Sequence, residues 1–294
     1  MKITKKANAK INLSLDLTGV LPNGYHAIHT VMQSVTLHDL VTVSNDAAGI
    51  TLACSMPGVP TDESNTAVKA ARFFFEEAAL DPRAQIVIEK KIPSQAGLAG
   101  GSADAAAVLC ALNELNGFPL DSRILRKIAL KIGADVPFAL KGGLRLCLNI
   151  GEITAELPPF HCFAVIAKPE HGVSTVEAFK KYDGGAPLRH PDNDRVLYHL
   201  AAGQPHAALQ AACNVFEQLI DLPETDRTNR AMRKNGAFYA ALSGSGSACF
   251  GLFDTLEDAE KAKAALENEL PFVCLCETAD TGVEGVRSFS REEI

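Results

Sequence analysis

The chain has 294 residues, of which 47% are hydrophobic and 21% are charged, an ordinary composition for one large or two average domains. Its net charge of −7 argues against a general nucleic-acid binder, which usually presents a basic surface. No apolar run approaches the roughly 18 residues needed to cross a membrane, and the lysine-rich start lacks the apolar region of a secretory signal. The eight cysteines form no C-x-x-C pair, so we expect reduced, mostly buried thiols and a cytoplasmic location.

The first half of the chain is expected to combine strands and helices. Alternating apolar and polar residues predict a strand over 9–17, and a turn with Pro and Asn-Gly follows at 21–24. A second strand is expected over 31–43, with a break near His38 and Asp39. The elements expected after it are helix 65–79, strand 85–91, helix 103–115, helix 121–131 and strand 142–150.

Consecutive prolines at 158 and 159 favour a boundary between two domains, 1–157 and 158–294. A strand over 162–167, a helix over 175–182 and a loop over 184–194 are expected beyond it. The closing elements are strand 238–242, strand 248–253, helix 256–270 and strand 272–277. This β-turn-β-α-β order is typical of part of a ferredoxin-like sandwich. The polar tail 278–294 is expected to fray.

The most informative motif is the stretch from Pro93 to Ala106, a loop of small residues that leads into an alanine-rich helix. Glycines let several backbone N–H groups converge on one point, and a helix N-terminus directs free N–H groups to the same place. Phosphate is the natural ligand of such a site. The loop has neither the lysine of a Walker A motif nor the G-x-G of a dinucleotide fold, and a plain strand-to-helix turn is the alternative.

Four further segments are candidates, each with a simpler structural explanation. Ser243–Ala248 is either a tight hairpin or a backbone that approaches a ligand closely. Lys10 and Asn12 share one face of a strand, which is either functional or merely solvated. Asp135 lies among Ala, Val, Pro and Phe and is either a partly desolvated acid or a helix-ending residue. Tyr25 and His26 follow a turn and either contact a base or serve the fold.

Taken in this order, the motifs resemble the GHMP small-molecule kinases over nearly the whole chain. The resemblance rests on Pro93–Ala106, Leu242–Phe253, Ala7–Leu13 with Asn23–His26, Gly133–Phe138, and Val173–Thr175 with Tyr182. The family usually carries glycine where Gln95 and Ala99 stand in this chain. Within the family, the motifs are most similar to members that phosphorylate an alcohol carried by cytidine diphosphate.

The resemblance implies an α+β, two-domain GHMP kinase fold. Its N-terminal domain would be ribosomal-protein-like, its C-terminal domain a ferredoxin-like sandwich, and its active site the cleft between them. The implied reaction moves the γ-phosphoryl of ATP, with Mg²⁺, to the 2-hydroxyl of a methylerythritol linked to cytidine diphosphate, in non-mevalonate isoprenoid synthesis. The implied partners are these small molecules, with neither nucleic acid nor membrane, and the protein would be a monomer or weak homodimer.

The resemblance also implies a role for particular residues. Asp135 would be the general base, and Lys10 would keep it ionised and stabilise the transferring group. The residues implied for ATP are Ser94, Gln95, Ala96, Gly97, Leu98, Ala99, Gly100, Gly101, Ser102, Ala103, Asp104, Asn65 and Lys91. The residues implied for the acceptor are Asn12, Tyr25, His26, Thr175 and Tyr182. The Mg²⁺ ligands stay open, with Ser102 and Asp135 as nearby candidates.

Two alternatives remain open at this point. Another GHMP kinase, of the homoserine or mevalonate type, would share the phosphate loop but would have no base for Tyr25 and His26 to recognise. An RNA-binding protein related to the ribosomal fold would bind without turnover, and the net charge of −7 argues against it.

Overall fold

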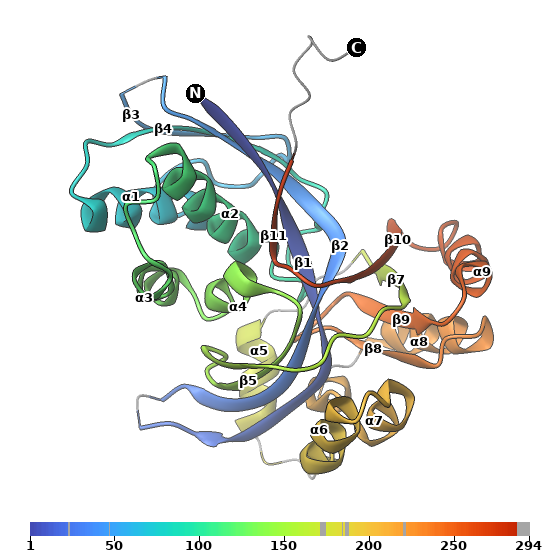
Figure 1. Cartoon of the computed structure of the whole chain (residues 1–294). Helices are drawn as coiled ribbons and strands as arrows, with labels where there is room; N and C mark the ends of the chain where they lie inside the picture. Colours follow the sequence, from blue (N-terminus) through green and yellow to red (C-terminus); the bar gives the residue numbers. More distant parts are fainter. Residues whose placement is uncertain are drawn as a thin grey trace.

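The computed structural model describes residues 1–22, 24–46, 48–170, 175–183, 185, 188–219 and 222–286, without the side chains of 175–177. It contains long N-terminal strands, with helices on both sides of them (Figure 1). Among the helices of this described part, none has the length and apolar character needed to cross a membrane. The expected α+β class is confirmed.

The N-terminal part contains most of the long strands. Its elements are β1 (Lys2–Val20), β2 (His26–Ser44), β3 (Gly49–Cys54), α1 (Thr66–Ala78), β4 (Arg83–Glu89), α2 (Gly100–Leu115), α3 (Ser122–Ile132), α4 (Val136–Lys141), β5 (Leu144–Asn149) and β6 (Ile153–Glu156).

The C-terminal part contains shorter elements. They are β7 (Phe163–Lys168), α5 (Thr175–Asp183), α6 (Asn193–Ala201), α7 (Pro205–Ala211), the 3₁₀-helix η1 (Val215–Gln218), α8 (Pro223–Lys234), β8 (Tyr239–Leu242), β9 (Cys249–Phe253), α9 (Leu256–Leu266), β10 (Phe272–Ala279) and β11 (Val283–Gly285).

Side-chain caps define where the predicted helices begin. The Asn65 side chain accepts a hydrogen bond from the N–H of Ala67 at the start of α1. Asp121 does the same for Arg123 and Ile124 at the start of α3. Such caps satisfy N–H groups that have no partner within the helix. These local signals explain why the sequence predicts both helices to within a residue or two.

Strand β2 organises the sheet because it pairs with four other strands. It is antiparallel to β1 over most of its length, to β4 at its C-terminal end and to β5 at its N-terminal end. Between these ends, β10 pairs with β2 and continues to β7, β9 and β8. Within the described residues, eleven strands therefore form one continuous hydrogen-bonded network.

Helix α2 packs against β1, β2 and α1 in the centre of the N-terminal part. Its alanine-rich sequence keeps the helix narrow, and ten of its residues are buried. A separate cluster of buried residues, including Val165, Phe216 and Phe253, lies under the C-terminal strands. The phosphate loop is the part of Pro93–Ala106 that precedes α2. Its Ala96 and Leu98 are buried in the larger core, and the N–H of Lys10 in β1 donates to the carbonyl of Leu98.

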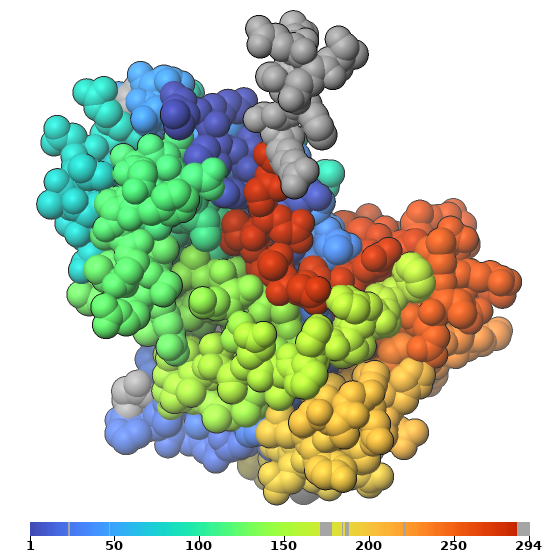
Figure 2. Space-filling view, in the orientation of Figure 1, coloured from blue at the N-terminus to red at the C-terminus, as the bar shows by residue number. Residues whose placement is uncertain are grey.

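Three predictions about regular structure are wrong. Strand β2 continues through His38 and Asp39, and the chain absorbs the irregularity as a register shift opposite Asn8 and Ala9. Helix α4 and strands β3 and β6 have no counterpart among the expected elements. The tail contains β11, which pairs with β1, and Figure 2 shows the red C-terminal residues against the dark-blue N-terminal strand. The expected boundary between two domains at residue 157 remains a prediction.

Candidate active site

The phosphate loop lines a cavity of about 280 Å³. The lining consists of Lys90 and residues 92–101. The loop ends in helix α2, which begins at Gly100. The α2 dipole and its free N–H groups therefore adjoin the cavity, an arrangement suited to an anion. The structure brings together most of the residues that the sequence assigns to ATP.

Gln95 and Ala99 occupy positions whose backbone explains the glycines that the family usually has there. Their φ angles are +52° and +57°, in the left-handed region. That region costs an ordinary residue roughly 1–2 kcal/mol and costs glycine almost nothing. This chain therefore keeps the loop conformation while carrying two side chains that strain it.

The loop contacts the candidate segment Ser243–Ala248 directly. The Ser243 hydroxyl donates a 2.9 Å hydrogen bond to the carbonyl of Gly97, and the N–H of Ala248 donates to the carbonyl of Ala96. The buried Asn214 amide donates to the carbonyls of Leu242 and Gly244 and so restrains the turn. Ser243–Ala248 is thus a turn that supports the phosphate loop.

A second cavity of about 190 Å³ adjoins the loop and contains the predicted catalytic pair. Lys10, Asn12 and Asp135 line it together with Gly97 and Gly244. Strand β1 supplies the first two, and Asp135 precedes helix α4. Residues far apart in the sequence therefore converge where a phosphate held by the loop would meet an acceptor.

Lys10 is almost entirely buried, and its ammonium group donates to the Asn12 side chain at 2.5 Å. The Asn12 amide in turn donates to the Thr30 hydroxyl. Burial lowers the pKa of Lys10, and the charge of Asp135 opposes that shift. Lys10 is thus held by Asn12 and interacts electrostatically with Asp135.

An aromatic cluster lies beside this second cavity. The His26 ring stacks on Phe179 with centroids 4.6 Å apart and meets Tyr182 edge-on at 5.6 Å. His26 also contacts the Asp183 carboxylate at 2.7 Å. Phe179 and Phe216 line the cavity itself. The structure therefore joins His26 and Tyr182 and adds two phenylalanines that the sequence reasoning missed.

Only part of this cluster was visible in the sequence. Phe179 precedes Tyr182 by one helical turn of α5, a spacing that places both on one face and signals their association. Phe216 comes from η1, and no pattern in the sequence indicated that it would join the cluster.

Among the other residues assigned to the acceptor, Tyr25 is 63% exposed. Thr175 begins α5, but its side chain lies outside the described residues, as do Asn23, Val173 and Ser174.

Lys90, and not Lys91, lines the phosphate cavity. Its ammonium group lies 2.5 Å from a carboxylate oxygen of Asp39 and 2.7 Å from one of Asp104. Asp39 also accepts hydrogen bonds from the backbone N–H groups of Lys91 and Ile92. This buried network fixes the start of the loop, whereas the Lys91 side chain is exposed.

Two other residues assigned to ATP have structural contacts. The Asn65 side chain is engaged in capping α1 and donates to the Pro60 carbonyl. The adjacent Thr66 hydroxyl donates to the carbonyl of Gly101. The start of α1 therefore lies against the loop, with Thr66 making the contact. Asp104 is buried against Lys90.

The Asp104 network makes stability depend on pH. Burial raises the pKa of Asp104 to about 7 from 3.8, with Asp39 adding to the shift and Lys90 opposing it. Between pH of about 4 and 7 the folded state holds a proton that the unfolded state releases, so this group's contribution to the free energy of unfolding falls as pH rises. The Asp104→Asn variant has no carboxyl group to ionise at this position. As the pH rises from 5 to 8, the melting temperature of the natural protein should therefore fall by several degrees relative to that of the variant.

Thermal denaturation of both proteins across this pH range measures the difference. Asp81→Asn, which removes an exposed carboxylate, serves as the control and should follow the natural protein at every pH. A constant difference between Asp104→Asn and the natural protein would contradict a proton bound at Asp104.

The comparisons with known proteins show the family of the chain. Residues 65–143 match the model of the GHMP kinases N terminal domain, and residues 207–271 match that of the GHMP kinases C terminal domain. A 4-diphosphocytidyl-2-C-methyl-D-erythritol kinase of Clostridium botulinum (strain Alaska E43 / Type E3) is 37% identical over 93% of this chain and 99% of its own length. One from Thermoanaerobacter sp. (strain X514) is 38% identical over 96% of this chain and 98% of its own.

Solved structures agree with the same assignment. A crystal structure of 4-(cytidine 5'-diphospho)-2C-methyl-D-erythritol kinase superimposes with a TM-score of 0.80 at 30% identity, covering 94% of this chain and 99% of that one. Homoserine kinase from Cytophaga hutchinsonii shares the fold, with a TM-score of 0.75 at 21% identity over 97% of each chain.

The chain belongs to the GHMP kinase family. Its two-domain fold is the one implied by the sequence motifs. Within the family it belongs to the 4-diphosphocytidyl-2-C-methyl-D-erythritol kinases.

Proposed function

We propose that the protein transfers the γ-phosphoryl group of ATP to the 2-hydroxyl of 4-diphosphocytidyl-2-C-methyl-D-erythritol, giving the 2-phosphate and ADP in non-mevalonate isoprenoid synthesis. The observation that carries the proposal is the cavity shared by Lys10, Asp135, Gly97 and Gly244. It places a cation and a carboxylate beside the phosphate loop. Phosphoryl transfer needs this combination of positioning and charge stabilisation.

The proposed roles follow from where each group lies. The loop holds the triphosphate through backbone N–H groups, and Asp135 accepts the proton of the attacking hydroxyl. Lys10, oriented by Asn12, stabilises negative charge on the transferring group. Burial lowers the pKa of Lys10, and the charge of Asp135 opposes that shift and so favours the ammonium form.

Mg²⁺ fits this site as an ion held largely by the triphosphate. Among the described residues, no group of three His, Cys, Asp or Glu side chains forms a metal site. Mg²⁺ commonly binds through one or two protein oxygens together with substrate phosphates. The Asp135 carboxylate, which lines the acceptor cavity, and the Ser102 hydroxyl, in the first turn of α2, would be the candidate protein oxygens. When bound, the ion would offset the charge of the phosphates.

The aromatic cluster supports a substrate with a base. His26 stacks on Phe179, and Tyr182 and Phe216 meet these rings edge-on, so the acceptor side has a partly apolar aromatic cluster. Aromatic rings favour stacked or edge-on contact with other rings. Acceptors of the homoserine or mevalonate type offer no ring for this cluster.

A panel of acceptor alcohols tests the proposal. ADP release should be rapid with 4-diphosphocytidyl-2-C-methyl-D-erythritol and at least a hundredfold slower, by kcat/KM, with homoserine, mevalonate and methylerythritol lacking the cytidine diphosphate. Loss of the aromatic contacts accounts for the last difference. Activity on homoserine or mevalonate alone would overturn the assignment, and tight RNA binding without ATP turnover would favour the nucleic-acid alternative.

The remaining features of the proposal concern the protein's setting. All eight cysteines are free, which supports a reducing, cytoplasmic environment. We propose that it acts on small molecules as a monomer or weak homodimer, without nucleic acid or membrane. Sedimentation at micromolar concentration measures the oligomeric state.

A further inference from the structure

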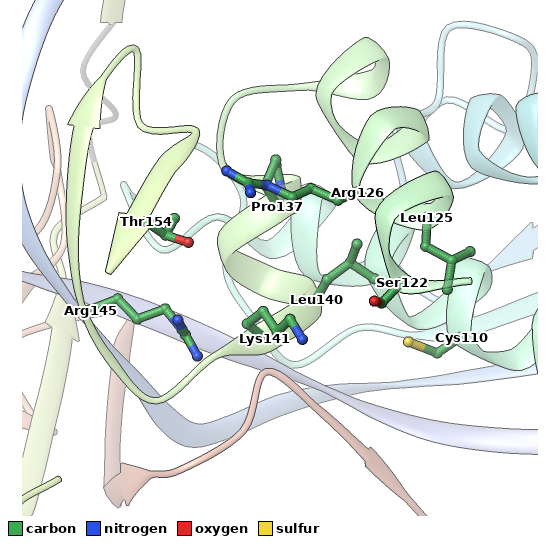
Figure 3. Close-up of a pocket in the computed structure, with 9 residues that line it drawn as sticks. All are labelled: Cys110, Ser122, Leu125, Arg126, Pro137, Leu140, Lys141, Arg145 and Thr154. Carbon is green, nitrogen blue, oxygen red and sulfur yellow. The ribbon is translucent and has the colours of Figure 1, made fainter. Parts of the chain in front are cut away.

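A third cavity, of about 280 Å³, lies away from the two that form the candidate active site. Helices α2, α3 and α4 and strands β5 and β6 enclose it (Figure 3). It shares none of its lining residues with the phosphate or acceptor cavities. The lining residues are Cys110, Ser122, Leu125, Arg126, Pro137, Leu140, Lys141, Arg145 and Thr154.

Positive charge dominates this cavity. Arg126, Lys141 and Arg145 line it, and none of the lining residues is acidic. Figure 3 shows them arriving from three elements, α3, α4 and β5, around one hollow. Burial raises the pKa of the Cys110 thiol to about 11, so this group is uncharged at neutral pH and does not repel an anion.

The acidic side chains nearby have other partners. Glu114 pairs with Lys5, and Glu152 accepts hydrogen bonds from the Asn149 side chain and from the backbone N–H of Ile150. Glu156 pairs with one nitrogen of Arg145 at 3.0 Å and is itself largely exposed. The structure records no ion pair for Lys141 in the part of the chain it describes. The cavity therefore retains net positive charge.

The two arginines are held in place. The Arg145 Nε atom donates to the carbonyl of Gly142 at 2.8 Å, and Arg126 donates to the carbonyl of Glu152 at 2.8 Å. A guanidinium has five N–H donors in a rigid plane, so each arginine keeps donors for a ligand. Pre-organised arginines are well suited to phosphate oxygens, because little side-chain entropy is lost on binding.

Part of the cavity lining is apolar. Leu125 comes from α3, and Pro137 and Leu140 come from α4. The Ser122 and Thr154 hydroxyls lie at its edges. The volume is near the lower end of the roughly 300–1,000 Å³ range of small-molecule sites, which limits the ligand to a small compound.

We propose that this cavity is a second ligand site, which binds a small phosphorylated compound with a short apolar group. The phosphate contacts Arg126, Lys141 and Arg145, and the apolar group packs on Leu125, Pro137 and Leu140. Inorganic phosphate would contact only the three cationic side chains and would therefore bind more weakly.

Titration of the full-length protein, saturated with ADP to fill the phosphate loop, tests the proposal. The probe is n-butyl phosphate, compared with inorganic phosphate, and isothermal calorimetry measures the dissociation constants. Butyl phosphate should bind with one equivalent and several-fold more tightly than phosphate. Arg126→Ala combined with Lys141→Ala should weaken butyl phosphate at least tenfold, because two charged contacts are lost.

The matched control is Arg123→Ala, which removes a cation from α3 that is 90% exposed and outside the cavity. It should leave the dissociation constant unchanged. Leu125→Trp, which fills the apolar side without altering charge, should also abolish tight binding and gives an independent check if the double variant is unstable. Equal binding of butyl phosphate and phosphate, or unchanged binding in both cavity variants, would overturn the proposal. Because the readout is binding with ADP in place, the result is separable from the proposed kinase reaction.

Discussion

The Asp135→Asn variant is expected to lose about 10²- to 10⁴-fold in kcat, the range that general acid–base catalysis contributes. Asparagine keeps the size of the side chain and cannot accept the proton of the acceptor hydroxyl. Asp135 lines the acceptor cavity and lies outside the phosphate cavity, so the affinity for ATP measured without Mg²⁺ should change little. Steady-state ADP release and calorimetric ATP binding measure the two quantities separately.

Lys10→Ala should lower kcat comparably, because it removes both the partner of Asp135 and the cation of the cavity. Asp81→Asn is the matched control, an exposed carboxylate that lines neither cavity. Near-natural turnover in Asp135→Asn would exclude Asp135 as the base, whereas a parallel loss of ATP affinity would indicate a disturbed loop.

Gly97→Ala is expected to reduce kcat/KM by about a hundredfold or more, the cost of misplacing a site by roughly 1 Å. An added Cβ atom would lie 2.0 Å from the Ser243 carbonyl oxygen and 3.2 Å from the backbone nitrogen of Gly246. The φ of +72° also disfavours any side chain. Because both neighbours are backbone atoms, the loop and the supporting turn must separate, and both cavities lose their shape.

Gly101→Ala provides a control within the same loop. Its φ lies outside the left-handed region, and its added Cβ would meet only the Thr66 hydroxyl, at 3.2 Å. We expect a melting temperature within a few degrees of the natural protein for Gly101→Ala and a clear decrease for Gly97→Ala. Equal melting temperatures and equal kcat/KM for the two variants would contradict the contact between Gly97 and Ser243.

The fold was predictable where its signals are local. Helices α1 and α3 have caps and apolar spacing within a dozen residues, and the sequence places them almost correctly. Strand β11 has three residues in a polar tail and exists because it pairs with β1, a partner at the other end of the chain. No local pattern contains that information.

The residues of the candidate site were likewise predictable only where the signal is local. Lys10 and Asn12 were predictable as neighbours because alternate residues of a strand share a face. The Lys90–Asp39 pair joins strand β2 to the segment after β4, and the exposed Lys91 is an equally plausible candidate from sequence alone. Phe216 reaches the acceptor cavity from a short 3₁₀-helix, a placement set only by tertiary packing.

The return of β10 and β11 to the first two strands has a consequence for how the protein is made. Strand β2 ends at Ser44, and β10 begins only at Phe272. At ribosomal rates of about 5–20 residues/s, the nascent N-terminal sheet waits roughly 10–50 s for its last strands. During that interval the backbone groups of β1 and β2 that later pair with β11 and β10 are unpaired, and other chains can pair with them. The protein should therefore need chaperones more during translation than during refolding of the complete chain.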